Sequence, residues 1–444
     1  MKIFWSSVIV FFSVIVGYKV FWNAYVALAI WIGLYMAVNI WANDVANSVW
    51  PAVGSKAITI KQAILIAAVW NFSWAIIAGW DVVNTIKKWI IDVTPITQTY
   101  WEAAWLEIFV LIMLAALLAG WLWLTFATYV RAPVSTTHSI VGWVMWSWIA
   151  ALGFWAVSWP TMWKIAASWF ISPVLGWIIA ALFLYWIKTT ILFKEDKVSS
   201  AKTWVPFYVA IMSWAFTTYL IVKGIKQVVK VEFINAALIW MLIAAITFVI
   251  MRKYLKKKKS LKNDKESIAS LFSIPLIFAV ALLTFAHGAN DVANAIWPMA
   301  AIYDTFMNGN ISSKVDLPIW ILALGWFGIS FWLAVFGPRI IKTVGGWITE
   351  LDRIRAFCIA LAASITVIIA SQLWLPVSST HIAIWWIFWV GLLREWIYRK
   401  ERKKWEKYVE RSMVKKIVWA WLITVPASAL LAWLLFMVLK DIML

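Results

Sequence analysis

The chain has 444 residues, of which 64% are hydrophobic and 13% are charged, and its formal net charge is +19. This composition excludes an ordinary soluble protein, because apolar stretches of about 20 residues, the length that crosses a bilayer, recur along the whole chain. The single cysteine, Cys358, excludes a disulfide framework and a cysteine-based metal cage.

The predicted elements are apolar segments, which indicate an all-α polytopic membrane protein. Some are short or interrupted by proline and are expected to be half-segments or hairpins, so we expect about twelve transmembrane segments. The first has the length of a signal peptide but no small-residue cleavage site, so we interpret it as a membrane segment. The segments lie near residues 3–16, 24–42, 59–80, 105–130, 139–157, 163–187, 204–222, 234–250, 271–297, 317–337, 355–374, 381–393 and 417–438.

The positive charge is concentrated in two loops. Residues 252–265 hold eight Lys or Arg and one acid, and residues 394–416 hold ten and four, so these loops carry 13 of the 19 net charges. Such loops are typical of the cytoplasmic side of a membrane protein. An anionic-lipid role for the four lysines at 256–259 is the alternative, and no nucleic-acid partner is expected.

Two polar motifs occur twice in the same order. Residues 41–48 read WANDVANS and residues 288–295 read GANDVANA, an offset of 247. Residues 133–138 read PVSTTH and residues 376–381 read PVSSTH, an offset of 243. Because the two offsets nearly agree, we interpret the chain as two homologous halves.

The halves are expected to be inverted relative to each other. The first copy of the first motif lies in the second predicted segment and the other copy in the ninth, so seven crossings separate them. An odd number of crossings turns the second copy over. Inverted repeats place a substrate site near the bilayer midplane, where the halves meet. The predicted units are an N-terminal membrane segment (1–23), a first transporter repeat (24–187), a linking part with two helices and a basic loop (188–270), a second repeat (271–395) and a basic loop with a C-terminal helix (396–444).

Each copy of the first motif places a carboxylate among asparagines in apolar sequence. An ionisable group such as Asp44 or Asp291 costs at least ~2.5 kcal/mol inside a bilayer, so it is a functional candidate by default. On a helix, Asn43 and Asn47 share one face with the carboxylate beside them. Their oxygens suit Na⁺ or another small hard cation, and their amide nitrogens can donate to an anion. Hydrogen bonding between helices is the alternative. The second copy offers Asn290, Asp291 and Asn294.

The second motif predicts the start of a half-helix in each copy. Pro133 and Pro376 remove a backbone donor and bias the preceding residue away from helix, so a new helix is expected just after them. The hydroxyl groups that follow would lie at a helix N-terminus, which attracts anions through its free N–H groups and its dipole. Plain N-capping is the alternative. The candidate anion ligands are Ser135, Thr136, Thr137, Ser378, Ser379 and Thr380.

All three histidines fall inside these motifs. His138 and His381 occupy equivalent positions, and they could donate to the anion or orient the hydroxyl groups. His287 has Ile40 as its equivalent, so a packing role is the alternative for it. A zinc site is disfavoured, because the sequence has no HExxH or comparable close spacing.

The doubled motif resembles the signature of the inorganic phosphate transporters called the PiT family. The resemblance covers roughly residues 24–160 and 271–395. It implies symport of inorganic phosphate with Na⁺ or H⁺ across the cell membrane, without enzyme activity or a cofactor. It also implies that the hydroxyl residues of PVSTTH and PVSSTH contact phosphate. The residues that match the family's ion and phosphate ligands are Asn43, Asp44, Asn47, Asn290, Asp291 and Asn294.

Tryptophan is abnormally frequent, with 39 Trp against 17 Gly. Trp41 stands where the second copy and the family signature have glycine, and Trp50 and Trp297 stand where a small residue is expected. An indole there would overfill a closely packed site, at ~1–3 kcal/mol per position. One hypothesis is that the codon UGA, which some bacteria read as glycine, has been translated as tryptophan. Deliberate substitution is the rival explanation.

The choice between phosphate and sulfate depends on the proton that phosphate carries and sulfate lacks. Phosphate near neutral pH still carries a proton, so its O–H group can donate a hydrogen bond to the carboxylate of Asp44 or Asp291. Sulfate would leave the acceptor unpaired, so the sequence favours phosphate. The alternatives are a sulfate transporter of the same fold and an ion channel or non-transporting receptor. The expected partners are phosphate, Na⁺ or H⁺ and the lipid bilayer, and a homodimer stays open.

Overall fold

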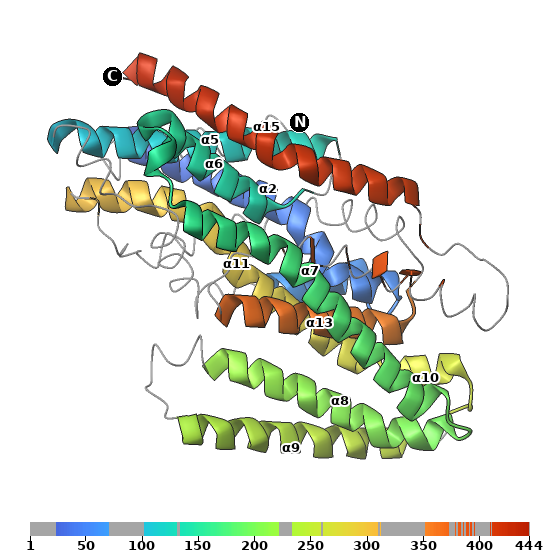
Figure 1. Cartoon of the computed structure of the whole chain (residues 1–444). Coiled ribbons are helices and arrows are strands. Elements are labelled where there is room, and N and C mark those ends of the chain that lie inside the picture. The colour runs from blue at the N-terminus through green and yellow to red at the C-terminus, as the bar shows by residue number, and fades with distance from the viewer. Residues whose placement is uncertain are drawn as a thin grey trace.

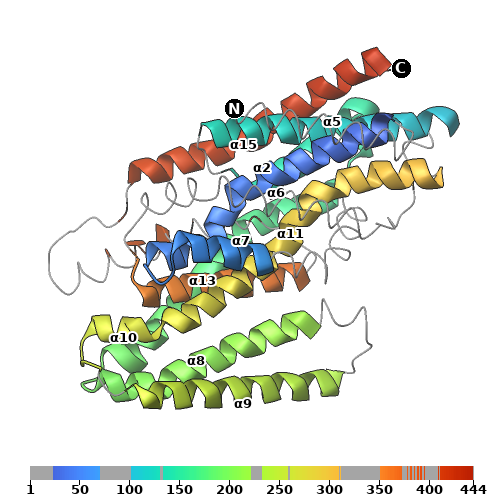
Figure 2. The same ribbon diagram turned by 180° about the vertical axis from the view of Figure 1, so that it is seen from behind.

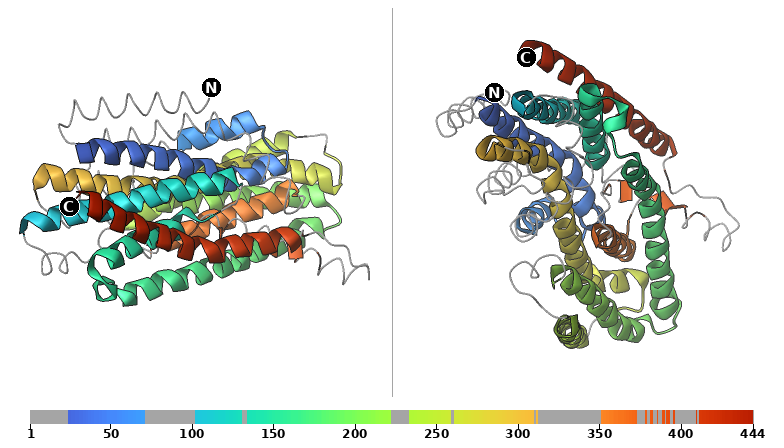
Figure 3. Two further views of the ribbon diagram at one scale, coloured as in Figure 1. Left: turned by 90° about the horizontal axis from the view of Figure 1, so that it is seen from above. Right: turned by 60° about the vertical axis from the view of Figure 1, so that its left-hand side comes forward.

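The apolar segments form long helices in the computed structural model, and these helices run roughly along one common direction (Figures 1 and 3). Every regular element in the described part of the chain is a helix, which confirms the all-α prediction. The structure describes residues 24–70, 102–130, 134–221, 233–258, 261–309, 351–372 and 411–443, with residues 311, 378, 381, 382, 385, 388, 389, 391, 392, 395 and 409.

The first half of the chain supplies the helices that precede residue 193. The long helices are α2 (Ala24–Gly54), α5 (Glu102–Tyr129), α6 (Thr136–Leu152) and α7 (Trp159–Ile187). A shorter apolar helix covers Ile60–Trp70. A 3-10 turn, η1 (Phe154–Ala156), lies between α6 and α7, and a π-helical turn, η2 (Lys188–Leu192), extends α7.

The rest of the chain adds a peripheral helix pair and the second set of core helices. The pair is α8 (Lys197–Tyr219) and α9 (Phe233–Lys257), which pack against each other at one edge of the bundle (Figure 1). The remaining helices are α10 (Lys265–Leu271), α11 (Ser273–Asn308), α13 (Arg353–Gln372) and α15 (Arg411–Met443).

Helices α5 and α13 occupy the core, and α9 lies at the surface. The apolar windows of α5 and α13 are each 72% buried inside the protein, against 17% for α9, which leaves most of α9 for contact with lipid. Five helices in the described ranges are long and apolar enough to cross a membrane, and the bent pair α10 and α11 adds a sixth. The predicted segments at 3–16 and 317–337 lie outside these ranges, so the total of about twelve stays a prediction.

Helices α2 and α11, which carry the two copies of the first motif, lie side by side and run in opposite directions (Figure 2). This is the relation that inverted repeats require. The predicted end of the segment 24–42 is wrong, because α2 continues to Gly54. Polar side chains lower the hydropathy of a segment without breaking its backbone hydrogen bonds, so the motif lies inside a continuous helix. Helix α11 likewise continues to Asn308, beyond the predicted end at residue 297.

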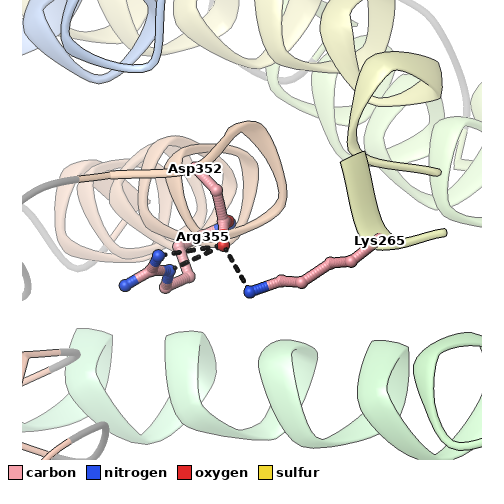
Figure 4. Close-up of polar contacts among 3 residues, drawn as sticks. All are labelled: Lys265, Asp352 and Arg355. Carbon is pink, nitrogen blue, oxygen red and sulfur yellow. Dashed lines mark hydrogen bonds and ion pairs between the residues drawn. The ribbon is translucent and has the colours of Figure 1, made fainter. Parts of the chain in front are cut away.

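A polar junction ties α10 to the start of α13 (Figure 4). Asp352 Oδ2 lies 3.2 Å from Lys265 Nζ and 2.9 Å from Arg355 Nη2, and Asp352 Oδ1 accepts the Arg355 backbone N–H at 2.9 Å. Burial favours the neutral acid, but the charges of Arg355 and Lys265 and the bonds from Arg355 outweigh it, so the pKa of Asp352 lies below its usual value. Arg353 extends the junction by donating from Nη2 to the carbonyl oxygen of Lys56 at 3.2 Å.

Candidate functional site

The first half-helix begins at the predicted serine. Ser135 has an extended backbone (φ −83°, ψ 115°), and its Oγ accepts the backbone N–H of His138 at 3.1 Å. The Ser139 hydroxyl donates to the Ser135 carbonyl oxygen at 2.7 Å. In this N-cap geometry a side-chain oxygen satisfies an N–H group that the helix leaves unpaired. The helix start expected after Pro133 is therefore confirmed.

The second copy has the same local geometry. Ser378 Oγ accepts the backbone N–H of His381 at 3.1 Å, and the Ser378 carbonyl oxygen accepts the Ile382 N–H at 3.0 Å. The matching carbonyl of Ser135 accepts the Ser139 N–H at 3.1 Å. Two segments 243 positions apart thus cap a helix in the same way. The other two hydroxyl candidates of this copy, Ser379 and Thr380, lie outside the described residues.

The start of α6 favours a negative group. Its first turn carries no acidic residue, and Thr136 and Thr137 of that turn are buried. The N-terminal end of a helix bears about half a positive charge from its aligned peptide dipoles, and its first N–H groups point outward along the axis. A buried helix start with hydroxyl groups is therefore a favourable place for an anion.

The two half-helix starts meet at their histidines. The ring centroids of His138 and His381 lie 4.1 Å apart, and the ring planes are perpendicular. Both side chains are buried, and the Nε2 atom of each has no hydrogen-bond partner among the described residues. Buried imidazole nitrogens normally find a partner, so two unpaired atoms at one contact indicate a place where a polar ligand can bind.

Two tryptophans that were not predicted as site residues enclose this histidine pair. Trp169 of α7 stacks on His138 with centroids 3.8 Å apart, and Trp421 of α15 lies 3.7 Å from His381. Four aromatic rings therefore form one continuous contact from the first half to the second. The sequence holds no specific signal for them, because tryptophan precedes a proline inside a helix in α2, α8 and α11 as well.

For the carboxylate and amide candidates, the structure describes the helix backbone but not the side chains. Asn43, Asp44 and Asn47 belong to α2, and their helical backbone puts residues 43 and 47 on one face, as predicted. Helix α11 includes the equivalent residues of the second copy. It also contacts α6, the helix that Ser135 caps. The side-chain contacts of these motif residues, and of His287, lie outside the described part of the structure. The residues of α11 equivalent to those of the first motif are Asn290, Asp291 and Asn294.

One hydrogen bond fixes α2 to α5 next to the first motif. Asn39, which is buried and lies one helical turn before Asn43, donates from Nδ2 to Thr125 Oγ1 at 2.9 Å. The Thr125 hydroxyl in turn donates to the Trp121 carbonyl oxygen at 2.7 Å. This chain of bonds holds the rotation of α2 about its axis, and with it the direction of the motif face. Sequence reasoning missed Asn39, which has Ala286 as its equivalent in the second half.

Metal binding is limited by the available ligands. The described ranges contain no group of three or more His, Cys, Asp or Glu side chains that could hold a metal ion. The histidine pair supplies only two nitrogen ligands, fewer than the three or four protein ligands of a typical zinc site. A cation site at Asp44 and Asp291 stays a prediction.

Comparisons with known proteins agree with one another. A model described as the phosphate transporter family matches residues 40–432. A Helicobacter pylori protein named "Putative phosphate permease" is 44% identical, with 93% of this chain and 89% of that protein covered. A Chlamydia trachomatis protein of the same name is 34% identical, with coverages of 92% and 97%. A solved structure described as "The sodium-dependent phosphate transporter" is similar with a TM-score of 0.84 and 31% identity, covering 95% of this chain and 100% of that one.

Proposed function

The chain belongs to the phosphate transporter family, and on this premise we propose that it carries inorganic phosphate across the cell membrane by symport with Na⁺. The observation that carries the proposal is the meeting of two serine-capped helix starts at His138 and His381, 4.1 Å apart. Sodium is preferred to the proton as coupling ion because a similar solved structure is that of a sodium-dependent transporter.

The anion is held between the two helix starts. Each start offers backbone N–H groups, the positive end of a helix dipole and hydroxyl donors, which suit a tetrahedral oxyanion. His138 and His381 supply nitrogen atoms that have no other partner among the described residues. The remaining phosphate ligands in this proposal are Asn43, Asn47, Ser135, Thr136, Thr137, Asn290, Asn294, Ser378, Ser379 and Thr380.

The cations are held by the motif helices. Asp44 and Asp291 provide the carboxylates, and the amide oxygens of Asn43 and Asn290 complete a set of hard oxygen ligands. Cations beside the anion also lower the cost of moving a multiply charged ion into the membrane, because an isolated buried charge is very unfavourable. This mutual stabilisation is the physical reason for symport.

Transport then requires the bound ions to face each side in turn. In this proposal the site lies between the two half-helix starts, and the antiparallel contact of α2 with α11 supports an inverted arrangement of the halves. Rocking of one half against the other around such a site would open it first to one side and then to the other. The ring contact between His138 and His381 would be one of the surfaces that move.

The proposal is tested by uptake of labelled phosphate in a host that lacks its own phosphate transport. Wild-type protein is expected to accumulate phosphate, and replacing Na⁺ with a large organic cation is expected to reduce uptake at least tenfold. The double variant Asp44→Ala, Asp291→Ala is expected to lose uptake. Asp441→Ala, which removes an exposed carboxylate at the end of α15, serves as the matched control with unchanged uptake.

Three results would contradict the proposal in different ways. Uptake that survives the double aspartate substitution would remove the assigned cation ligands. Inhibition by excess sulfate equal to that by unlabelled phosphate would point to the sulfate branch. Phosphate flux without accumulation, independent of Na⁺ and pH, would indicate a channel.

A further inference from the structure

The two half-helices share one pattern of glycine and tryptophan. The offset of 243 that relates the PVSTTH and PVSSTH motifs also pairs residues 139–153 with 382–396. Within 139–153, glycine or tryptophan occupies only positions 142, 143, 146, 148 and 153. Within 382–396 they occupy only positions 385, 386, 389, 391 and 396, which are the same five places in the repeat. Glycine and tryptophan, the smallest and the largest residues, therefore occupy the same five places in both segments and no other place in either segment.

Three of these five pairs have glycine in one copy and tryptophan in the other. They are Gly142 with Trp385, Trp148 with Gly391, and Gly153 with Trp396. The first motif adds a fourth pair at its own offset of 247, Trp41 with Gly288. Packing does not explain such an exchange, because the two side chains differ more in volume than any other pair of residues.

The first copy shows why glycine is required at two of these places. Gly153 has φ 85° and ψ 172°, a conformation that only glycine adopts without strain. A Cβ atom on Gly142 would lie 3.2 Å from Ser428 Oγ of α15, so the close approach of α6 to α15 leaves no room for an indole there. The repeat carries tryptophan at the positions equivalent to both.

The tryptophans of the first copy are poorly accommodated. Trp143 and Trp148 are at most 2% exposed, so both indole rings lie inside the protein, between closely packed helices. The Trp143 ring also takes the space beside Gly120 of α5, where an added Cβ would lie 2.7 Å from it. With glycine at 146 as well as at 142, α6 would present two small residues one turn apart, which is the usual means of close helix packing in membranes.

We infer that the tryptophans at positions 41, 143, 146, 148, 385, 386, 389 and 396 are glycine in the protein that the cell makes. In this inference the codon UGA is decoded by a glycine transfer RNA, and the printed tryptophans follow from a code in which UGA means tryptophan. The inference goes beyond the transport function, because it concerns the residues that let the helices around the site approach each other.

Two other tryptophans are excluded from this set and provide the control. Trp169 and Trp421 do not belong to the repeated pattern, and each makes a close ring contact with a site histidine. Because both lie outside the repeated pattern, the inference leaves them as tryptophan, encoded by UGG.

The codons and the native protein test the inference directly. UGA is expected at the eight positions and UGG at 169 and 421. Peptide mass spectrometry of the protein purified from its own cells is expected to find glycine at the eight positions and tryptophan at the two controls. UGG codons or tryptophan-containing native peptides at most of the eight positions would overturn the inference.

A transport assay gives an independent readout in a host with the standard code. One gene encodes tryptophan at the eight positions, and the other encodes glycine. The glycine chain is expected to insert and accumulate phosphate, and the tryptophan chain to show at least tenfold lower uptake. Equal uptake by both chains would contradict the packing argument. If native peptides contain glycine but neither chain transports phosphate, the residue assignment stands and the proposed function fails.

Discussion

At the scale of single residues, Ser135 and Ser378 have equivalent roles in the two halves. Each caps the helix that begins beside it, and each orients the backbone of the histidine three positions later. Because the two histidines touch, a loose cap on either side would also disturb the other half. We therefore expect the caps to affect both the stability of the helix starts and the geometry of the proposed anion site.

Ser135→Ala and Ser378→Ala are each expected to weaken a helix start by about 0.5–2 kcal/mol. If that loss falls on phosphate binding, the apparent affinity drops by up to about tenfold for each 1.4 kcal/mol. The measurement is the concentration dependence of phosphate uptake. Ser158→Ala is the matched control, because Ser158 precedes α7 without a side-chain capping bond, and its uptake curve is expected to stay unchanged. Equal effects at all three serines would contradict the assignment.

Asp352 is expected to stabilise the protein in a pH-dependent way. Its pKa is lowered in the folded state, so its contribution is fully present above the pKa of an unfolded aspartate, about 3.9, and is lost as the pH falls through the lower folded value. Asp352→Asn should reduce the thermal midpoint in detergent at pH 7. The difference from wild type should shrink below about pH 4. A difference that is constant with pH, or equal to that of the exposed-site control Asp441→Asn, would contradict this role.

Local rules account for what could be predicted at this scale. Proline disfavours helix at the residue before it and serine is a good N-cap, so the caps at Ser135 and Ser378 were predictable from the sequence. The contact between His138 and His381 was not, because a repeat shows that two residues are equivalent but not that they touch. Trp169 and Trp421 were missed because their role depends on how α7 and α15 pack.

At the scale of elements, the orientation of α2 depends on its neighbour α5. Asn39 is buried, and the bond from its Nδ2 to Thr125 is the contact that fixes the rotation of the helix beside the motif. An amide that loses its acceptor in an apolar interior costs about 1–3 kcal/mol. In the proposed function, a rotation of α2 would change the direction of the helix face that carries the first motif.

Thr125→Val, which keeps the shape but removes the acceptor, is therefore expected to lower both the thermal midpoint and the rate of phosphate uptake. Thr125→Ser keeps the hydroxyl and should behave like wild type. Comparing these two variants isolates the hydrogen bond from the size of the side chain. If the valine variant transports at the wild-type rate, the bond does not position the motif.

Helix boundaries show the limit of hydropathy. The predicted segments at 163–187 and 234–250 correspond closely to α7 and α9, because their polar residues lie outside the apolar stretch. In α2 the candidate residues are polar and follow the apolar stretch, so hydropathy ended the element at residue 42, inside the first motif. In α11 the predicted segment contains the second motif, and the part that hydropathy missed is the end of the helix after residue 297.

At the scale of the whole molecule, the orientation of the protein in the membrane can be tested with one cysteine introduced at each end of the helix bundle. Cys358 is fully buried in α13, so the wild-type protein should not react with a water-soluble maleimide. Lys257 ends α9, and Met307, which is 63% exposed, lies near the end of α11 at the opposite end of the bundle (Figure 1).

Lys257→Cys is expected to react only after the cells are permeabilised, and Met307→Cys is expected to react in intact cells. The reason is that the basic loop at 252–265 predicts the cytoplasmic side. The measurement is labelling by an impermeant maleimide. The reverse pattern would contradict the predicted orientation, and labelling of wild-type protein would contradict the burial of Cys358.

The peripheral position of α8 and α9 affects how the halves are connected. In the chain order these two helices separate the first half from the second, yet α9 packs mainly on α8 at the edge of the bundle. The covalent connection between the halves therefore runs through a helix pair at the edge of the bundle. In the proposed transport cycle we expect this pair to leave the halves free to tilt, so that the contacts among the core helices limit the extent of the movement.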